Sequence, residues 1–451
     1  MAFRVLSLDG GGVWSVVQAL ALIRIYGPET TGRQVLREFD LVAATSAGSI
    51  VLGGLIEDLP LGAILQIFQD EKLRKGMFRK SRDKLSLLIH HVTGLFPGLG
   101  GSGVGPIYST AEKQAALEKL LGPYAHCPLK RAARGVRRSG SERDVHLLII
   151  AFDYDRERAQ FFRSARACGR GWGRGDPSSV TLAQAISAST DPPINYFDKP
   201  ATIRPDRYWD GAIAGYNNPV LAAVSESIVL KQAPTDIVAL SIGTGRVSLA
   251  GPPTTKASPF VKQRKPQCLV SDIGKIAVSI VDDPPDAATF MAHVMTGGID
   301  GLPDPLDSRI VRMSPLVRPV LCEDEWVAPA GMKPAAFTTL AGLGIDAIEQ
   351  DQVDAIVRYA EKWLADEAPN QPIRMDGDTF ECELGHERFK DALAAWVRLK
   401  ALSEAPGPLG SRPGTPSPSR ASDNPGQAPD RSDPQERLDE RSQPVEPGTA
   451  G

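Results

Sequence analysis

Four short runs of almost uninterrupted apolar residues constrain the fold of this chain more than any other feature. Runs of this kind are typical of strands that are buried on both faces of a parallel sheet. They are FRVLSL (3–8), DLVAA (40–44), VHLLIIA (145–151) and DIVALSI (236–242). Helical periodicity covers the intervening stretches 13–26, 46–57, 60–72, 110–121, 181–189 and 218–230. This alternation predicts an α/β fold, a doubly wound and mostly parallel sheet flanked by helices, with functional groups at the carboxyl ends of its strands.

Helical patterns dominate the sequence after about residue 270. We expect extra C-terminal helices at 271–281, 286–296, 346–366 and 384–401. No linker-like stretch separates them from the earlier segments, so we place them in the same domain. The predicted domain covers 1–402, with a motif-bearing part at 3–245 and a mainly helical part at 270–402.

The stretch 403–451 differs in composition from the rest of the chain. It is rich in Pro, Ser, Arg and Asp, holds ten of the 37 prolines and has no aromatic residue. Such a segment buries too little apolar surface to offset the entropy that ordering it would cost. We expect a disordered tail that acts as a solubilising appendage or a tether.

The charge balance and the cysteines exclude several classes of protein. Lys and Arg total 51 against 54 Asp and Glu, a net charge of −3, so no nucleic-acid polymer is expected as a partner. The five cysteines are widely spaced without a CxxC pair, which argues against a disulfide framework or a zinc ribbon and for a reducing compartment. The start MAFRVLSLDGGG has too short an apolar run for a signal peptide, and no apolar run reaches the roughly 18 residues of a membrane span. We therefore expect a cytoplasmic protein.

A glycine-rich turn, Asp9-Gly10-Gly11-Gly12, lies directly after the first apolar run and directly before a helical pattern. Glycines at such a turn let a ligand approach the backbone and present N–H groups at a helix N-terminus, where partial positive charge accumulates. The motif lacks the third glycine of a dinucleotide fingerprint and the lysine of a P-loop. The residues alone leave two interpretations open, an anion-binding turn or simply a tight turn.

A second turn of small residues, Ala44-Thr45-Ser46-Ala47-Gly48, follows the second apolar run and opens an apolar helix. It matches the pattern G-x-S-x-G except that Ala44 replaces the first glycine. A serine on a sharp strand-to-helix turn is presented as a nucleophile, and small neighbours let the chain fold back closely on both sides. The alternative is a serine that only caps the helix N-terminus.

The third motif is Asp210-Gly211-Ala212. An Asp before Gly is most often a turn residue, although a carboxylate within hydrogen-bond reach of a serine can act as its base. Of the six histidines only His386 comes late enough to be a conventional catalytic base, and we interpret it as a structural residue. His90 and His91 have no partner at metal-ligand spacing, so we expect neither a metal nor a cofactor.

In this order the three motifs resemble those of the patatin-like phospholipases, lipid acyl hydrolases with a Ser-Asp dyad. The resemblance extends over roughly residues 3–245. It includes AISASTDPPINYF (185–197), which is similar to the small-residue segment ahead of the dyad Asp, and SIGTG (241–245), which is similar to a late strand and glycine turn of the family.

The resemblance implies a lipid acyl hydrolase of the phospholipase A or lysophospholipase type that needs no metal. Ser46 would be its nucleophile and Asp210 its general base. The resemblance also implies an oxyanion hole made of backbone N–H groups, and small residues that support the elbow and the dyad turn. These are Gly10, Gly11 and Gly12 for the oxyanion hole, and Ala44, Gly48 and Gly211 for the two turns.

Trp14 and Ser15 depart from the DGGGxRG pattern that many family members carry. A fixed cation at that place could hold a lipid phosphate, so the departure bears on the preference for phospholipids more than on hydrolysis. We expect membrane phospholipids or other lipid esters as substrates. Two alternatives stay open: a soluble-ester hydrolase or acyltransferase with the same dyad, and a catalytically silent binding or regulatory protein on the patatin scaffold.

Two basic clusters, 72–84 and 130–143, interrupt the body of the chain. They are typical of a solvated helix face and a surface loop. The alternative for the first is a peripheral membrane contact through 72–97, in which cations meet lipid phosphates and apolar residues enter the acyl region. By analogy with family members that act in antiphage defence, the arginines of 130–143 and 163–174 could bind a nucleotide second messenger, the alternative being exposed loops without a special role.

Overall fold

The computed structural model describes residues 2–80, 107–164, 179–193, 196–249, 260–261, 284–297, 308–323, 325–329, 331–373 and 384–404. The chain divides into two units, Met1–Ser411 and Arg412–Gly451. The second unit and nearly all of the tail predicted at 403–451 lie outside the described residues, as does the helix predicted at 271–281.

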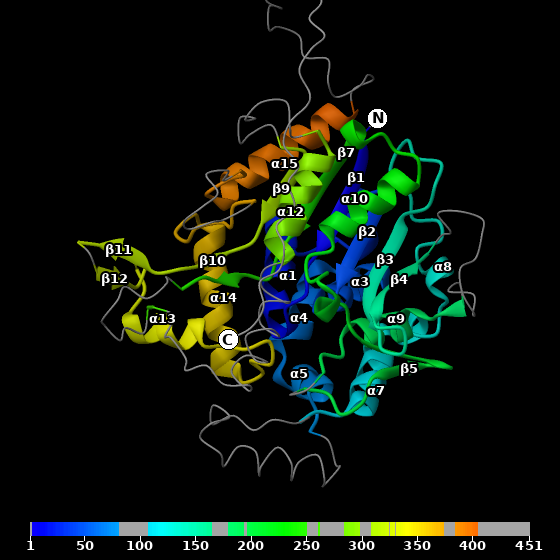
Figure 1. Ribbon diagram of the computed structural model, residues 1–451, viewed down its shortest axis with the longest axis horizontal. Helices are drawn as coiled ribbons and strands as arrows, with labels where there is room; N and C mark the ends of the chain where they lie inside the picture. Colours follow the sequence, from blue (N-terminus) through cyan, green and yellow to red (C-terminus); the bar gives the residue numbers. More distant parts are fainter. Residues whose placement is uncertain are drawn as a thin grey trace, which may run out of the picture. The chain divides into compact units, whose positions relative to one another are not determined.

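Within the described residues, five parallel strands form the larger part of an eight-stranded sheet (Figure 1). In spatial order they are β3 (His146–Asp153), β2 (Leu41–Thr45), β1 (Phe3–Leu8), β7 (Ile237–Ile242) and β9 (Ile310–Met313). Four of them coincide with the predicted apolar runs, so the mostly parallel α/β sheet is confirmed. The fifth, β9, was not predicted, because its short segment IVRM includes an arginine.

Three antiparallel strands extend the sheet at β3. They are β4 (Arg158–Arg163), β5 (Ala201–Ile203) and β6 (Asp206–Asp210). β4 pairs with residues 148–153 of β3 along one edge, so β2 and β6 must share the other edge. On that edge β2 ends with Thr45 opposite Ile150, and β6 ends with Asp210 opposite Ala151. The ends of β2 and β6 therefore meet.

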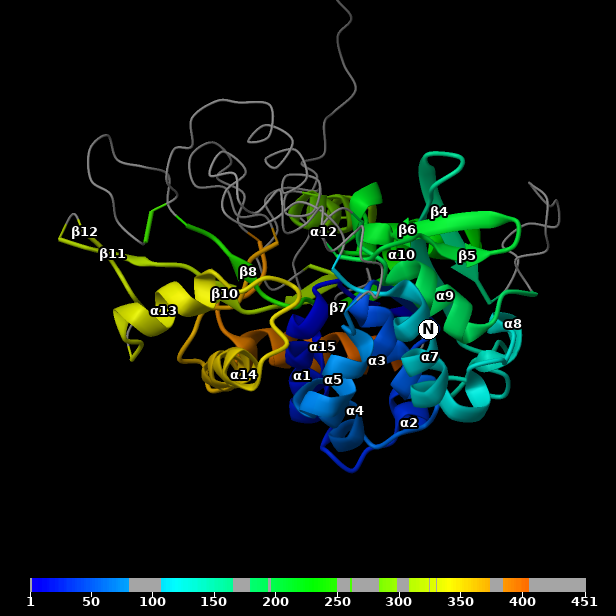
Figure 2. The same ribbon diagram turned by 90° about the horizontal axis from the view of Figure 1, so that it is seen from below.

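Helices cover both faces of the sheet (Figure 2). Alternate strand residues point to opposite faces. Leu6 and Val42 pack into the layer of α1 (Val16–Tyr26), α3 (Ala47–Ile56), α4 (Leu61–Gln69), α7 (Thr110–Leu121), α9 (Leu182–Ser189), α14 (Gln350–Leu364) and α15 (Phe389–Glu404). Val5 and Leu41 pack into the layer of α10 (Val220–Val229) and α12 (Pro284–Met295). These helices match the predicted ranges to within four residues at each end, except that α15 begins five residues late.

Shorter elements complete the described part of the chain. The helices are α2 (Gly32–Leu36), α5 (Glu71–Met77), α8 (Leu129–Ala132) and α13 (Pro334–Ala341), with 3₁₀ turns at η1 (Gly12–Ser15), η3 (Gly122–Tyr124), η5 (Gly211–Ala214) and η6 (Pro234–Asp236). Two small sheets pair β8 (Arg246–Val247) with β10 (Leu316–Val317) and β11 (Val320–Cys322) with β12 (Glu325–Val327). None of the described helices combines the length and the apolar character that crossing a membrane requires.

A buried ion pair joins the late strand β9 to the start of the glycine turn. Arg312 Nη2 donates to Asp9 Oδ2 at 2.6 Å, and Arg312 Nη1 donates to Ser241 Oγ at 2.8 Å. Both charged side chains are almost fully buried. Burial raises the pKa of Asp9, and the neighbouring guanidinium opposes that rise. The predicted C-terminal part of the domain thus contributes more than covering helices, because it anchors the segment that follows β1.

Replacing Arg312 with Met should destabilise the protein by about 3 to 5 kcal/mol, because it leaves the Asp9 carboxylate buried without its counter-charge. The double variant Asp9→Asn/Arg312→Met should regain part of this loss. Urea unfolding followed by circular dichroism measures both. Arg358→Met, the same change at an exposed position of α14, is the control and should alter the free energy of unfolding by less than about 0.5 kcal/mol. An Arg312→Met variant as stable as this control would contradict the assigned role of the ion pair.

Candidate active site

Ser46 lies on the sharp turn between β2 and α3. Its backbone angles are φ 50° and ψ −133°, a combination that residues with a side chain adopt only when the surrounding structure holds them there. The Ser46 N–H donates to Ser189 Oγ at 2.8 Å. Behind the turn, a side chain at Gly48 would come within 2.5 Å of the carbonyl oxygen of Leu8. The small residues of this motif therefore permit a close return of the chain against β1.

Asp210 meets Ser46 across the junction of β2 and β6. The Ser46 hydroxyl donates to Asp210 Oδ2 at 2.6 Å, although the two residues are 164 positions apart in the sequence. Asp210 Oδ1 accepts from the N–H of Ala212 at 2.9 Å, inside the 3₁₀ turn η5 that begins at Gly211. A side chain at Gly211 would come within 2.5 Å of the Ile150 carbonyl oxygen, so this turn also requires a small residue.

The environment of Asp210 sets its proton affinity. Burial raises the pKa of this carboxyl to about 6, while the hydrogen bonds from Ser46 and Ala212 and the charge of Lys113 act in the opposite direction. A carboxylate with such a pKa is ionised at neutral pH and still basic enough to accept a proton from a hydroxyl that attacks a carbonyl carbon.

The glycine turn lies beside Ser46, but its three N–H groups differ. The Gly10 N–H donates to the carbonyl oxygen of Asn217 at 2.8 Å, so it is already occupied. For the Gly11 and Gly12 N–H groups, no acceptor is found in the part of the chain that the structure describes. Gly12 has a φ of 58°, and a side chain there would come within 2.1 Å of the Ile345 carbonyl oxygen. The turn therefore presents two unoccupied donors, one of them at a position that only glycine fits.

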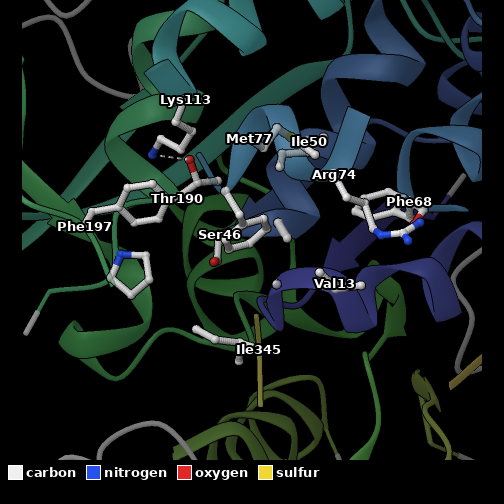
Figure 3. A pocket seen from close by; sticks show the side chains of 14 residues that line it. Val13, Ser46, Ile50, Phe68, Arg74, Met77, Lys113, Thr190, Phe197 and Ile345 are labelled. Carbon is white, nitrogen blue, oxygen red and sulfur yellow. Dashed lines mark hydrogen bonds between the residues drawn. The ribbon is translucent and has the colours of Figure 1, made fainter. Parts of the chain in front are cut away.

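Ser46 lines a pocket (Figure 3). Its walls are mainly apolar and come from several elements. The lining residues are Gly12, Val13, Ser46, Ala47, Ile50, Phe68, Arg74, Met77, Phe78, Lys113, Thr190, Pro192, Phe197 and Ile345. An apolar pocket with a hydroxyl at its base suits an aliphatic chain that ends in an ester.

The two cations of the pocket wall are engaged by protein groups. Arg74 is fully buried and donates to the carbonyl oxygens of Phe68 at 2.8 Å and Ile348 at 3.1 Å, and to Gln350 Oε1 at 2.8 Å. Interpreting the basic cluster 72–84 as a solvated helix face was therefore wrong for Arg74. The rest of the membrane contact predicted at 72–97 lies outside the described residues from 81 on.

Lys113, the second cation, is buried in α7 and forms an ion pair with Asp191. Sequence reasoning missed both cations. A signal existed for Lys113, since it shares the buried face of α7 with Leu117 and Leu121 at helical spacing. Ile345 also went unnoticed, because it lies outside every predicted motif.

Two other candidate residues that the structure describes, Trp14 and His386, do not line this pocket. Trp14 is buried, with Gly245 packed against its ring. His386 is buried and does not line the pocket, and His90 and His91 lie outside the described residues. In the described ranges, no group of three or more His, Cys, Asp and Glu side chains is placed to hold a metal ion.

Three arginines of the arginine-rich segments form ion pairs with carboxylates. Arg137 pairs with Asp144 and Arg138 with Asp40, each at 2.8 Å. Arg163 pairs with Glu226, while 165–174 lies outside the described residues.

Comparisons with known proteins match part of the sequence to a family. Residues 6–224 match the family model described as patatin-like phospholipase, a stretch that includes the glycine turn, Ser46 and Asp210. No curated protein sequence matches the chain. Among solved structures, the crystal structure of VipD from Legionella pneumophila is similar at 10% identity and a TM-score of 0.28, covering 80% of this chain and 67% of that one. A patatin-like phospholipase domain therefore spans residues 6–224 of the chain.

Proposed function

We propose that the chain is a serine hydrolase of the phospholipase A or lysophospholipase type, which cleaves carboxylic esters of lipids through a Ser46–Asp210 dyad. Its family supports lipid acyl hydrolysis in general. The observation that carries the proposal is the 2.6 Å hydrogen bond from the Ser46 hydroxyl to the Asp210 carboxylate at the base of an apolar pocket. No metal or cofactor enters the proposed reaction.

In the proposed reaction, Asp210 accepts the proton of Ser46 as its oxygen attacks the ester carbonyl carbon. The carbonyl oxygen becomes an oxyanion, which the N–H groups of Gly11 and Gly12 stabilise. The alcohol then leaves with the proton held by Asp210, and an acyl-enzyme remains on Ser46. Water attacks this ester, Asp210 accepts its proton, and the fatty acid leaves as Ser46 recovers a proton.

The walls of the pocket favour recognition through the acyl chain. Val13, Ile50, Phe68, Met77 and Ile345 offer apolar surface, and burial of each methylene of a substrate contributes about 0.8 kcal/mol.

A specific observation supports the second candidate, a hydrolase of uncharged esters or an acyltransferase with the same dyad. Trp14 is buried where many family members carry a cation, and both cations of the pocket wall donate to protein groups. Comparing kcat/KM for phosphatidyl lipids and for uncharged esters of the same acyl chain separates the two candidates. A preference of tenfold or more for the uncharged esters would favour the second.

Ser46→Ala and Asp210→Asn should each reduce fatty-acid release from phosphatidylcholine vesicles by about 10³-fold or more, because each removes one half of the dyad. Ser225→Ala on α10 and Asp206→Asn at the other end of β6 are matched controls outside the pocket and should retain activity. Turnover by either dyad variant at the wild-type rate would refute the assignment.

Activity should fall on the acid side of pH about 6, since Asp210 must be ionised to accept the proton and its pKa is about 6. Below that pH, kcat/KM should drop about tenfold per pH unit, and above it a plateau should follow. The measurement is kcat/KM for a soluble fluorogenic ester between pH about 4 and 9. An acid limb near the ordinary pKa of Asp, about 3.9, would contradict the burial assigned to this carboxylate.

Ile345 should limit the length of the acyl chain. Ile345→Trp should fill the pocket and lower kcat/KM for long-chain esters by about tenfold or more, with little effect on acetyl esters. The backbone contact of Ile345 with the Val13 N–H does not depend on the side chain. Val397→Trp, at an exposed position of α15, is the control. Equal losses across a series of ester chain lengths would show that Ile345 does not contact the chain.

A further inference from the structure

One short turn at the end of α9 contacts both members of the proposed dyad. Ser189 Oγ accepts from the Ser46 N–H at 2.8 Å and donates to the Ile150 carbonyl oxygen at 2.5 Å. Two residues later, the Asp191 carbonyl oxygen accepts from the Asp210 N–H at 2.9 Å. The turn 187–191 therefore fixes the backbone of the nucleophile and the backbone of the carboxylate relative to each other.

Lys113 ties this turn to α7. Its ammonium donates to the Ser187 carbonyl oxygen at 3.0 Å, to Thr190 Oγ1 at 2.9 Å and to Asp191 Oδ1 at 2.5 Å. These three bonds use all the donors of the ammonium group. Figure 3 shows Lys113 bonded to Thr190 beside the Phe197 ring, whose centroid is 4.7 Å from Nζ. The side chains of Lys113 and Asp191 are 3% and 0% exposed, so water screens their charges little.

The ammonium also acts on the charge of Asp210. Its positive charge lowers the pKa of Asp210, against the larger effect of burial. The groups that bear on this balance are the Ser46 hydroxyl, the Ala212 N–H, Lys113 from α7 and Asp191 from the turn, with Asp198 acting on Asp191. Burial raises the pKa of Asp191 to about 7, and Lys113 opposes that rise. The charge of Lys113 thus acts on two buried carboxyl groups, one structural and one proposed to react.

We propose that Lys113 is a positioning residue for acyl transfer to Ser46: it fixes the turn 187–191, which holds both dyad residues, and it supplies a buried positive charge to the site. The role rests on the proposed function only through the dyad, since it does not depend on which ester is cleaved. Lys113 forms no bond to the substrate and transfers no proton.

The test uses a fluorophosphonate, which reacts with an activated serine whatever the natural substrate is. The rate of Ser46 labelling is measured against pH for the full chain and for Lys113→Met, Asp191→Asn and the double variant. The acid limb is the fall of the labelling rate as the pH is lowered. In Lys113→Met, which lacks the ammonium, this limb should move to higher pH by about one unit. Because the pKa of Asp191 is about 7, this carboxyl is mostly neutral over the acid limb, so Asp191→Asn should move the limb by much less than Lys113→Met does. The limb of the double variant should lie above that of Asp191→Asn.

Lys119→Met, the same change at an exposed position of α7, should leave the pH of the acid limb unchanged. If Lys113→Met does not fold, as urea unfolding would show, the double variant, which removes both charges of the pair, is compared with Asp191→Asn instead. Acid limbs that stay unmoved in the folded variants lacking Lys113, or a lower rate with no change in pH dependence, would overturn the proposal. If Lys113 were only a structural part of the pocket wall, its replacement would raise KM for a soluble ester and leave the acid limb of the pH profile in place.

The outcome separates this inference from the proposed function. Labelling whose acid limb moves to higher pH without Lys113, but with no fatty-acid release from vesicles, would overturn the lipid substrate and support the role of Lys113. Fatty-acid release with unshifted limbs would overturn the role of Lys113 and leave the function intact. A wild-type chain that is not labelled at any pH would overturn both.

Discussion

The site depends on how the neighbouring strands pair with the two edges of strand β3. One edge of β3 pairs with β4, and the other pairs first with β2 and then with β6. Thr45 and Asp210 therefore lie opposite successive residues of β3, although one strand is parallel and the other antiparallel. Because strand register fixes position to within one residue, the hydrogen bond between Ser46 and Asp210 follows from the sheet itself. A mobile loop could not hold the two groups together as reliably.

The residues after the family match complete this arrangement. Arg312 of β9 compensates the buried charge of Asp9, which precedes the glycine turn. The carbonyl oxygen of Ile345 accepts from the Val13 N–H, and the Ile345 residue closes one side of the pocket. Arg74 donates to Ile348 and Gln350 in the same late segment. The matched part, 6–224, and the late part therefore contact each other around the pocket, while the single domain 1–402 stays a prediction.

What the sequence could predict follows from how local each signal is. The central strands, the serine turn and the Asp-Gly turn carry contiguous patterns, so Ser46 and Asp210 could be singled out without a structure. Lys113 could not be assigned a role, because its partner Asp191 is 78 residues away and no local pattern marks the pair. The Gly10 N–H was expected in the oxyanion hole, yet its bond to Asn217 depends on a contact between distant segments. Edge strands such as β5, with three residues, are too short for periodicity to reveal.

In the proposed reaction, the buried Asp210 carboxylate takes the role that a histidine base has in a conventional serine hydrolase. An exposed Asp, with a pKa of about 3.9, is too weak a base to accept a serine proton efficiently near neutral pH. Burial raises the pKa of Asp210 to about 6, close to the value of about 6.5 for an ordinary imidazole. Burial alone would also favour the neutral acid, which accepts no proton from serine. The bonds from Ser46 and Ala212 and the charge of Lys113 limit that rise, so the proposed base is both buried and ionised at neutral pH.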